Sequence, residues 1–190
     1  MMKGSSPYEH FLDRSLTHVM RFSSIPQQFQ ESVAEHSFYV AYFTSILIYF
    51  LKKEGVSVRE DRALKIALIH DMEEKFSGDI LTPFKYYSQE LYQAIRKVNR
   101  ETVPLVFEHL PKPLAKNFIA LWKEDVDRKT KEAQVVKVAD KLSLLSKCRE
   151  EMSLGNAFFK PIYDRELEAL RHLEWPWWQK IKNDVLPATH

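Results

Sequence analysis

The chain has 190 residues, a length that suits one ordinary domain with a substantial core and no need of disulfides. Twenty-eight Lys and Arg stand against 26 Asp and Glu, so the formal charge of +2 is too small to indicate a nucleic-acid partner. Only four glycines are present, which disfavours a turn-rich β-sandwich or barrel. The composition favours a helical protein.

One cysteine and one apolar run bear on the compartment and on membrane attachment. Cys148 is the sole cysteine, so no internal disulfide can form, and the starting segment MMKGSSPYEHF has no apolar signal region. The apolar run at residues 38–51 is about 14 residues long, below the roughly 20 that a membrane span needs. We expect a cytoplasmic protein with no membrane or nucleic-acid partner.

Capping and breaking residues predict helices along the whole chain. A capping-box pattern opens an expected helix at 32–53, and a second such pattern opens one at 57–70. Glycine and proline predict a polar loop at 76–85. Further helices are expected at 88–109, 114–125, 130–154 and 161–173, with a short helix or packed tail from Trp175. With no strand alternation, repeat or linker, the prediction is a single all-α domain.

His36 lies on the first capped helix, in a stripe with Val33, Val40, Phe43 and Leu47. These spacings place it on the apolar face, so its side chain should point into the core. Taken alone, such a histidine is more often a core residue with one hydrogen bond than a metal ligand.

Two further sites repeat this pattern of a polar side chain on an apolar surface. His70 continues the apolar face of the second helix, and Asp71 follows where that helix should end. Asp140 lies among apolar residues of a long helix, where an unpaired carboxylate is costly. Each residue could be packed or capping on its own account. A single divalent ion explains all of them together, because imidazole and carboxylate both bind transition metals. Four such ligands leave coordination positions open, which is typical of a catalytic ion.

The order His36, His70-Asp71 and Asp140 resembles that of HD-domain metal-dependent phosphohydrolases. Longer motifs resemble the YfbR-type 5′-deoxynucleotidases, namely MRF, SVAEHS, HDMEEKFSGDILTPFK, VVKVADKLSLL and EEMSLGN. The resemblance implies a single HD-domain helical bundle over residues 1–190. Its motif-bearing core is at about 18–156, and a C-terminal helix or tail covers 157–190.

The resemblance also implies the metal ligands and the catalytic groups. A divalent ion such as Co²⁺ or Mn²⁺ would be held by His36, His70, Asp71 and Asp140. Glu74 and Asp71 would be the catalytic carboxylates, with Glu74 orienting or deprotonating the attacking water. A carboxylate beside the ion is chemically suited to take that proton.

The implied substrate is a nucleoside 5′-monophosphate, from which phosphate is released. Arg21 would contact it near the phosphate and sugar, since a guanidinium matches phosphate oxygens with two parallel hydrogen bonds. Phe22 stands where bacterial family members carry tryptophan, and this smaller ring changes the wall expected against the deoxyribose. The implied substrate-binding residues are Arg21, Phe22, His36, Asp79, Ile80, Thr82 and Asp140.

Two alternative functions remain open. One is another HD reaction, such as hydrolysis of a cyclic nucleotide or a guanosine polyphosphate. The other is a non-catalytic regulator that binds a nucleotide through the same site. Glu74 favours catalysis, because binding alone needs no base at that position.

Several conspicuous side chains lie outside the implied site. Glu73 matches nothing in the family pattern, and we expect it at a solvated helix end. Tryptophans 175, 177 and 178 are expected to pack a terminal helix onto the core. The aromatic residues Tyr39, Tyr42, Phe43 and Phe50 cover more than one face of their helix. They predict a subunit interface, and the resemblance implies a homodimer.

Overall fold

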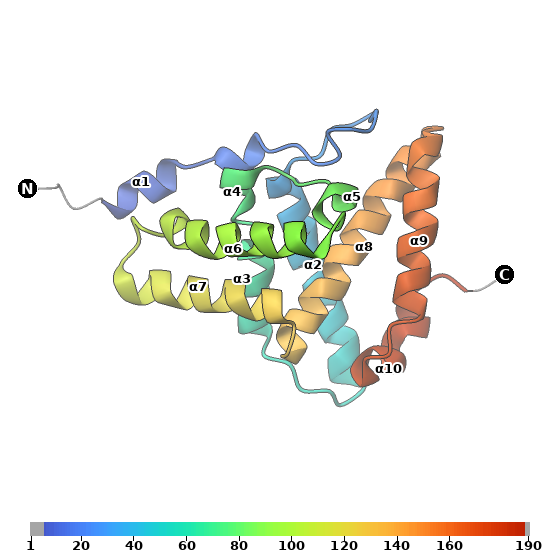
Figure 1. Ribbon diagram of the computed structural model, residues 1–190. Helices are drawn as coiled ribbons and strands as arrows, with labels where there is room; N and C mark the ends of the chain where they lie inside the picture. The colour runs from blue at the N-terminus through green and yellow to red at the C-terminus, as the bar shows by residue number, and fades with distance from the viewer. Residues whose placement is uncertain (1–5, 189–190) are drawn as a thin grey trace, which may run out of the picture.

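The structure, a computed structural model, describes residues 6–188, so both extreme ends of the expected 1–190 domain lie outside it. In that range the protein is a bundle of helices, with one isolated antiparallel bridge between Met20 and Ser32 and no sheet (Figure 1). The all-α prediction is confirmed. The α-helices are α1 (Pro7–Leu12), α2 (Val33–Lys53), α3 (Glu60–Ile69), α4 (Glu74–Ser77), α5 (Thr82–Lys85), α6 (Gln89–Val106), α7 (Lys112–Asp127), α8 (Lys131–Ser153), α9 (Lys160–Arg171) and α10 (Pro176–Val185), and the 3-10 turns are η1 (Ser15–Thr17) and η2 (Ala157–Phe159).

The centre of the bundle is the packing of α2 against α8 and α3. Val40 and Leu47 of α2 and Val135 and Ala139 of α8 are at most 1% exposed. Fully burying a valine or leucine side chain stabilises the fold by about 1.5–3 kcal/mol. The two longest helices therefore fix each other's position, and they carry functional residues on the same packed faces.

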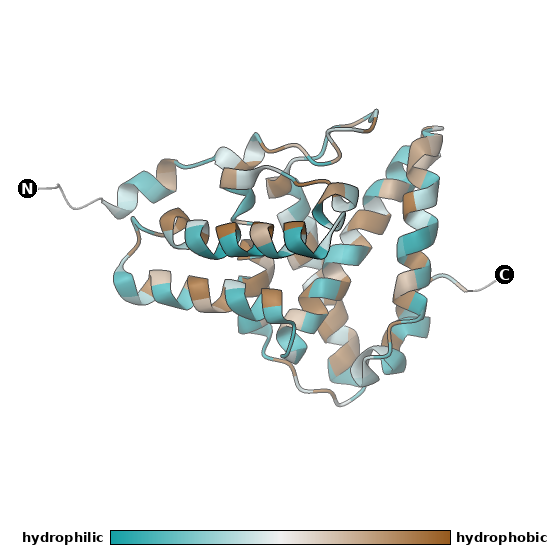
Figure 2. Cartoon of the chain, viewed as in Figure 1, coloured by the Kyte–Doolittle hydropathy of each residue, from teal (hydrophilic) through white to brown (hydrophobic). Residues whose placement is uncertain are grey.

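The outer helices show one apolar and one polar face. Hydrophobic and hydrophilic residues alternate in stripes along α6 and α7, which lie side by side in the view of Figure 2. At the other end, α10 packs Trp178 (0% exposed) and Trp177 (5%) into the core. The indole N–H of Trp178 donates to the carbonyl of Leu170 at 2.7 Å. The prediction that these tryptophans pack the terminal helix is confirmed.

The start of α2 agrees with the prediction from the sequence, and the start of α3 does not. At α2 the capping box is complete, because Ser32 N–H donates to the Glu35 carboxylate at 2.7 Å and Glu35 N–H returns a bond to the Ser32 hydroxyl. The second predicted box is wrong, since α3 begins at Glu60 and not at residue 57. Arg59 is extended and its N–H donates to Glu132 at 2.9 Å, so α8 binds this segment before the helix can start.

The predicted polar loop at 76–85 is partly helical. α4 and α5 occupy its two ends, and Gly78 with φ +68° separates them in a conformation that favours glycine. The sequence also gave no signal for α1. Between residues 6 and 188, no helix is both long enough and apolar enough to cross a bilayer.

Candidate active site

Two buried imidazoles lie at the junction of α2 and α3. His36 of α2 is 0% exposed, His70 at the end of α3 is 5% exposed, and their ring centroids are 5.3 Å apart. The inward orientation predicted for both is confirmed. Nδ1 of His70 donates to the carbonyl of Ala67 at 2.8 Å, which directs its Nε2 towards the site. Nδ1 of His36 lies 3.0 Å from the Ser143 hydroxyl, so its Nε2 also faces inward to the site.

Two carboxylates face these Nε2 atoms. Asp71 Oδ2 lies 3.0 Å from Nε2 of His70 and 3.7 Å from Nε2 of His36. Asp140 of α8 places Oδ1 3.2 Å from Nε2 of His36, while its Oδ2 accepts from Lys137 Nζ at 2.5 Å. The structure thus brings together all four residues that the sequence predicted as ligands.

This donor set fits a divalent cation. Neither Nε2 has a hydrogen-bond partner among the described residues, although both are buried. Ligand atoms of His36, His70 and Asp71 all lie within 4.8 Å of one another. Atoms bound to one ion at about 2.0–2.2 Å lie no more than roughly 4.4 Å apart. The distances to these nitrogens of 3.0 and 3.7 Å from Asp71 and of 3.2 Å from Asp140 to His36 lie within that limit. Orphaned imidazole nitrogens facing carboxylates are the chemistry of a metal site rather than of a packed core.

The charges of the site shift its protonation equilibria in opposite directions. Burial, with Arg21 nearby, lowers the pKa of His36 to about 4. Burial also acts to lower the pKa of His70, but the adjacent Asp71 outweighs it and raises that pKa to about 10. The pKa of Asp140 lies well below its usual range, because Lys137 and the two imidazoles offset the effect of burial. The pKa of Asp71 also lies below its usual range, because His70 outweighs the effect of burial, so both carboxylates are anionic.

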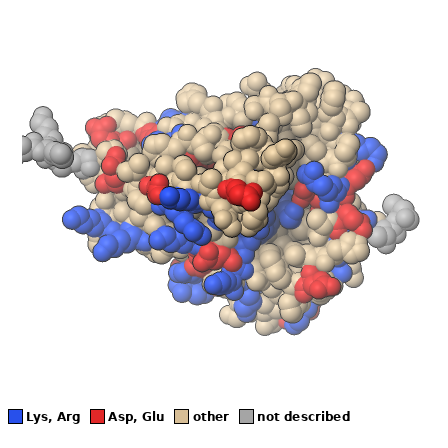
Figure 3. Space-filling model, in the orientation of Figure 1, with Lys and Arg blue, Asp and Glu red and all other residues tan. Residues whose placement is uncertain are grey.

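A cavity of about 170 Å³ opens next to this cluster. Its wall is densely charged, and basic side chains are visible in the hollow between α7 and α8 (Figure 3). The acidic residues of the wall are Asp71, Glu73, Glu74, Asp79, Asp125 and Asp140, and the basic ones are Arg21, Lys85, Arg96, Arg128 and Lys137. Six carboxylates around so small a space favour a bound cation, and the basic groups favour an anion beside it.

Glu74, the first residue of α4, reaches this cavity with an unpaired oxygen. Its Oε2 is buried and has no hydrogen-bond partner among the described residues. Burial, followed by the carboxylates of Asp71, Asp79 and Glu73, holds the pKa of Glu74 well above its usual value. A carboxyl group in such surroundings is suited to proton transfer.

Arg21 and Phe22 lie in the segment that leads into α2. The Arg21 guanidinium is 12% exposed, donates to Glu31 at 2.5 Å and lies 2.8 Å from Nδ1 of His36. Phe22 has a left-handed backbone with φ 56°, and its N–H donates to Asp79 Oδ2 at 3.0 Å. This bond links the segment to the loop between α4 and α5.

Most of the substrate-binding residues predicted from the sequence surround the cavity. Arg21, Asp79, Ile80, Thr82 and Asp140 line it directly. Two others do not. His36 is not part of the lining but contacts Asp140, which is, and the ring of Phe22 packs against Phe159 with centroids 5.3 Å apart.

The expectation for Glu73 is wrong. Its side chain is buried, at 7% exposed, and it accepts a 2.6 Å hydrogen bond from the indole N–H of Trp122 on α7. Burial, with Asp71 nearby, raises the pKa of Glu73 to about 7. The sequence around Glu73 has no signal for this contact, because its partner lies on a helix that folds back from elsewhere in the chain. Ser143 and Glu31 were missed for the same reason.

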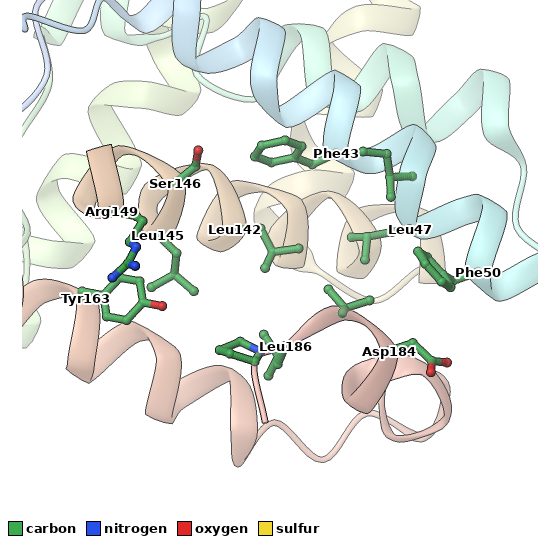
Figure 4. A pocket seen from close by; sticks show the side chains of 13 residues that line it. Phe43, Leu47, Phe50, Leu142, Leu145, Ser146, Arg149, Tyr163, Asp184 and Leu186 are labelled. Carbon is green, nitrogen blue, oxygen red and sulfur yellow. The ribbon is translucent and has the colours of Figure 1, made fainter. Parts of the chain in front are cut away.

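A second, larger cavity lies on the other side of α8. It measures about 390 Å³, and Figure 4 shows it bordered by Phe43 and Leu47 of α2, Leu142 and Leu145 of α8 and the segment around Leu186. Its lining is mainly apolar, and among residues 6–188 no cluster of potential metal ligands borders it. The smaller, charged cavity is therefore the candidate active site.

Comparisons with known proteins agree with this geometry. A 5′-deoxynucleotidase of Photorhabdus laumondii is 34% identical over 130 residues, which are 68% of this chain and 66% of that protein, just under two thirds of its length. A 5′-deoxynucleotidase of Vibrio parahaemolyticus is 28% identical over 98% of this chain and 95% of its own length. An HD-domain phosphohydrolase of Listeria innocua has a similar crystal structure, with a TM-score of 0.79, 26% identity and coverage of 95% of this chain and 86% of that one. Residues 9–189 match the family described as 5′-deoxynucleotidase YfbR-like, and the chain belongs to that family.

Proposed function

We propose that the protein is a metal-dependent phosphomonoesterase that hydrolyses deoxynucleoside 5′-monophosphates to nucleoside and phosphate. The observation that carries this proposal is the pair of buried, unpartnered Nε2 atoms facing Asp71 and Asp140, with the unpaired Glu74 oxygen on the same cavity. Family membership supports the same activity, because the two relatives described above are 5′-deoxynucleotidases.

His36, His70, Asp71 and Asp140 would hold the ion. When bound there, a divalent ion supplies positive charge to a phosphate oxygen and lowers the pKa of water. We infer a first-row ion such as Mn²⁺ or Co²⁺, because mixed imidazole and carboxylate ligands suit that class. The Ser143 hydroxyl and the Ala67 carbonyl keep the two imidazoles oriented for this task.

Glu74 takes a proton from the attacking water in this mechanism. Its position supports the role, since Oε2 is directed to no protein donor and lies on the wall shared with Asp71. Asp71 acts beside it as a ligand that also keeps negative charge close to the reacting groups. The family resemblance of the HDMEE segment supports these roles.

Arg21 binds the phosphate group. Its guanidinium already lies between Glu31 and His36, at the edge of the carboxylate cluster. Asp79, Ile80 and Thr82 form the wall next to it and would contact the sugar. Phe22 supports this wall from behind through its N–H bond to Asp79.

Initial rates of phosphate release test the proposal. The eight common ribo- and deoxyribonucleoside 5′-monophosphates would be assayed with Mn²⁺, Co²⁺ and other divalent ions, next to cyclic nucleotides and a guanosine polyphosphate. We expect turnover of the monophosphates, with a preference for the deoxy forms. Turnover confined to cyclic or polyphosphate substrates would assign a different HD reaction. Nucleotide binding with no turnover of any compound would assign a regulator.

We also infer a homodimer formed through α2. Its exposed side carries a row of apolar residues at intervals of four, four and three, so they lie on one face of the helix. The row consists of Phe38 (64% exposed), Tyr42 (55%), Ile46 (38%) and Tyr49 (60%). A contiguous aromatic row of this kind is uncommon on a monomer and is typical of an interface.

A further inference from the structure

The end of α8 carries a buried polar cluster that the proposed mechanism does not use. Glu151 is 0% exposed, Lys147 5% and Asn156 8%, and we call these three residues the α8 clamp. They belong to the EEMSLGN segment and the turn before it. Buried charged groups need specific partners, because leaving them unpaired is costly.

The partners of the clamp are backbone groups of one segment far away in sequence. Glu151 accepts from the N–H of Gln28 at 2.9 Å and from the N–H of Phe29 at 3.1 Å. Lys147 Nζ donates to the carbonyl of Phe29 at 2.6 Å. Asn156 donates to the carbonyl of Pro26 at 2.8 Å. The clamp thus binds four backbone groups within residues 26–29.

The clamp is also bonded within itself. The Glu151 carboxylate accepts from Lys147 and from Asn156, each at 2.8 Å. With the backbone N–H groups of Gln28 and Phe29, the two oxygens of this carboxylate accept four hydrogen bonds. Although burial alone would raise it, these hydrogen bonds lower the pKa of Glu151 to about 2. The carboxylate is therefore charged at neutral pH, with all four donors directed to it.

Residues 26–29 are the tip of a hairpin-like segment whose base holds Arg21 and Phe22. At the base, the N–H of Arg21 donates to the Glu31 carbonyl at 2.9 Å. Within the segment, the Gln27 side chain donates to the carbonyl of Arg21 at 2.8 Å. The backbone of the phosphate-binding arginine is therefore connected to the tip by a direct hydrogen bond.

Apolar packing does not hold this tip in place. Residues 23–30 include no buried side chain, and Phe29 is 57% exposed. A segment with few buried contacts keeps a fixed position only through its polar contacts. Those contacts are largely the ones made by the clamp.

We propose that Glu151 is a positioning residue for substrate binding, which, with Lys147 and Asn156, fixes residues 26–29 and thereby the placement of Arg21 and Phe22. This rests on the proposed function of Arg21 in binding the phosphate. The clamp contacts neither the substrate cavity nor the metal ligands, so it acts on affinity and on sugar selectivity through the segment.

The test compares Glu151→Gln with Glu150→Gln in the metal-loaded protein. Glutamine keeps the size of Glu151 but turns one acceptor into a donor that faces other donors. Glu150 is a matched control, because it is 52% exposed, also pairs with Lys147 at 2.9 Å and does not contact the segment. For Glu151→Gln we expect KM for dAMP to rise about tenfold and the dAMP-to-AMP ratio of kcat/KM to fall, with kcat and metal content within about twofold. Glu150→Gln should match the wild type.

Amide hydrogen exchange supplies a readout that needs no substrate. The N–H groups of Gln28 and Phe29 should exchange at least tenfold faster in Glu151→Gln, while amides of α2 and α8 keep their protection. Unchanged exchange would show that the clamp does not fix the segment. Faster exchange with an unchanged KM would show that the segment does not position the substrate, and either result overturns the proposal.

A milder variant covers the case in which Glu151→Gln does not fold. Asn156→Ala removes the bond to the Pro26 carbonyl and leaves Glu151 with its other three donors, and the same criteria apply to it. The proposed function is tested independently of the clamp, because it fails if the wild-type protein releases no phosphate from any nucleoside monophosphate. In that event the exchange rates still decide whether the clamp fixes the segment.

Discussion

Nε2 of His36 lies 3.2 Å from Oδ1 of Asp140, and this contact joins the two central helices at the candidate metal site. Both side chains project from the packed face between α2 and α8, where apolar residues would otherwise stabilise the fold. A polar pair in this position is costly unless it is compensated. A bound cation compensates both residues at once.

Removing one ligand should therefore empty the site. We expect Asp140→Asn and His70→Ala each to lose the metal and nearly all phosphate release, because few protein ligands hold the ion and water replaces them poorly. Metal content by mass spectrometry and initial rates would be measured together. His172→Ala is the control, since His172, the residue just after α9, is 75% exposed and pairs with Glu168 of that helix. Full metal content and full activity in either ligand variant would contradict the assignment.

Glu74→Ala should behave differently from the ligand variants. We expect it to keep the metal while kcat falls by about 10²-fold or more, the scale of a lost general base. Glu101→Ala, an exposed glutamate on α6, should change neither quantity. Loss of the metal from Glu74→Ala would make Glu74 a ligand.

Selectivity between deoxyribose and ribose should depend on residue 22. Phe22 does not line the cavity and its ring packs against Phe159, so a substitution there would act by moving the backbone N–H that binds Asp79. Phe22→Trp should raise the dAMP-to-AMP ratio of kcat/KM, and Phe22→Ala should lower it while phosphate release from dAMP stays largely intact. Phe29→Ala is the control on the same segment, because its ring is 57% exposed. If neither substitution at residue 22 changes this ratio, residue 22 does not influence sugar selectivity, and the sugar-contacting wall would be centred on Asp79.

The aromatic row on α2 predicts the oligomeric state. We expect the wild type to elute as a dimer in size-exclusion chromatography with light scattering, and Tyr42→Glu combined with Tyr49→Glu to elute as a monomer. Charges placed opposite each other in an apolar interface remain desolvated and unpaired. Tyr87→Glu, at an 85% exposed position between α5 and α6, should leave the dimer intact. A monomeric wild type would contradict the interface.

The pH dependence of stability should report on Glu151. Its pKa is about 2 in the folded protein and near the ordinary 4.5 in the unfolded chain, so ionised Glu151 stabilises the fold above about pH 4.5. This contribution is lost as the pH falls from about 4.5 towards 2, because the unfolded state takes up the proton first. Urea midpoints of the wild type and Glu151→Gln should therefore differ most at pH 6, and the difference should be smaller at pH 3.5. If the difference in urea midpoint between the two proteins is the same at both pH values, the charge of Glu151 does not contribute to stability.

Local patterns in the sequence predicted a large part of this structure. The capping box at Ser32 and the apolar stripe through His36 depend only on neighbours in the same helix, and both were predicted correctly. The start of α3 was not, because Glu132 from α8 binds the backbone of Arg59 and keeps it extended. Helix propensity cannot anticipate such a contact.

The candidate site, too, could be predicted from the sequence only in part. The four candidate ligand residues could be predicted because their residue types and order are characteristic of one kind of chemistry. The supporting groups, Ser143 on His36 and Trp122 on Glu73, have no local signature and depend on how distant helices pack. Glu73 was misplaced because a glutamate at a helix end is usually solvated, whereas here an indole N–H binds it inside the protein.

Asp140, Ser143, Lys147 and Glu151 follow each other along α8 at intervals of three, four and four residues, so they share one face of the helix. Inserting or deleting one residue between them would turn everything beyond it by about 100° and move the clamp away from its segment while the metal ligand stayed in place. The stretch from 140 to 151 is therefore intolerant of length changes even where single substitutions are harmless. Chimeras that exchange α8 between relatives should take it as one uninterrupted block, and natural gaps in family alignments should fall outside it.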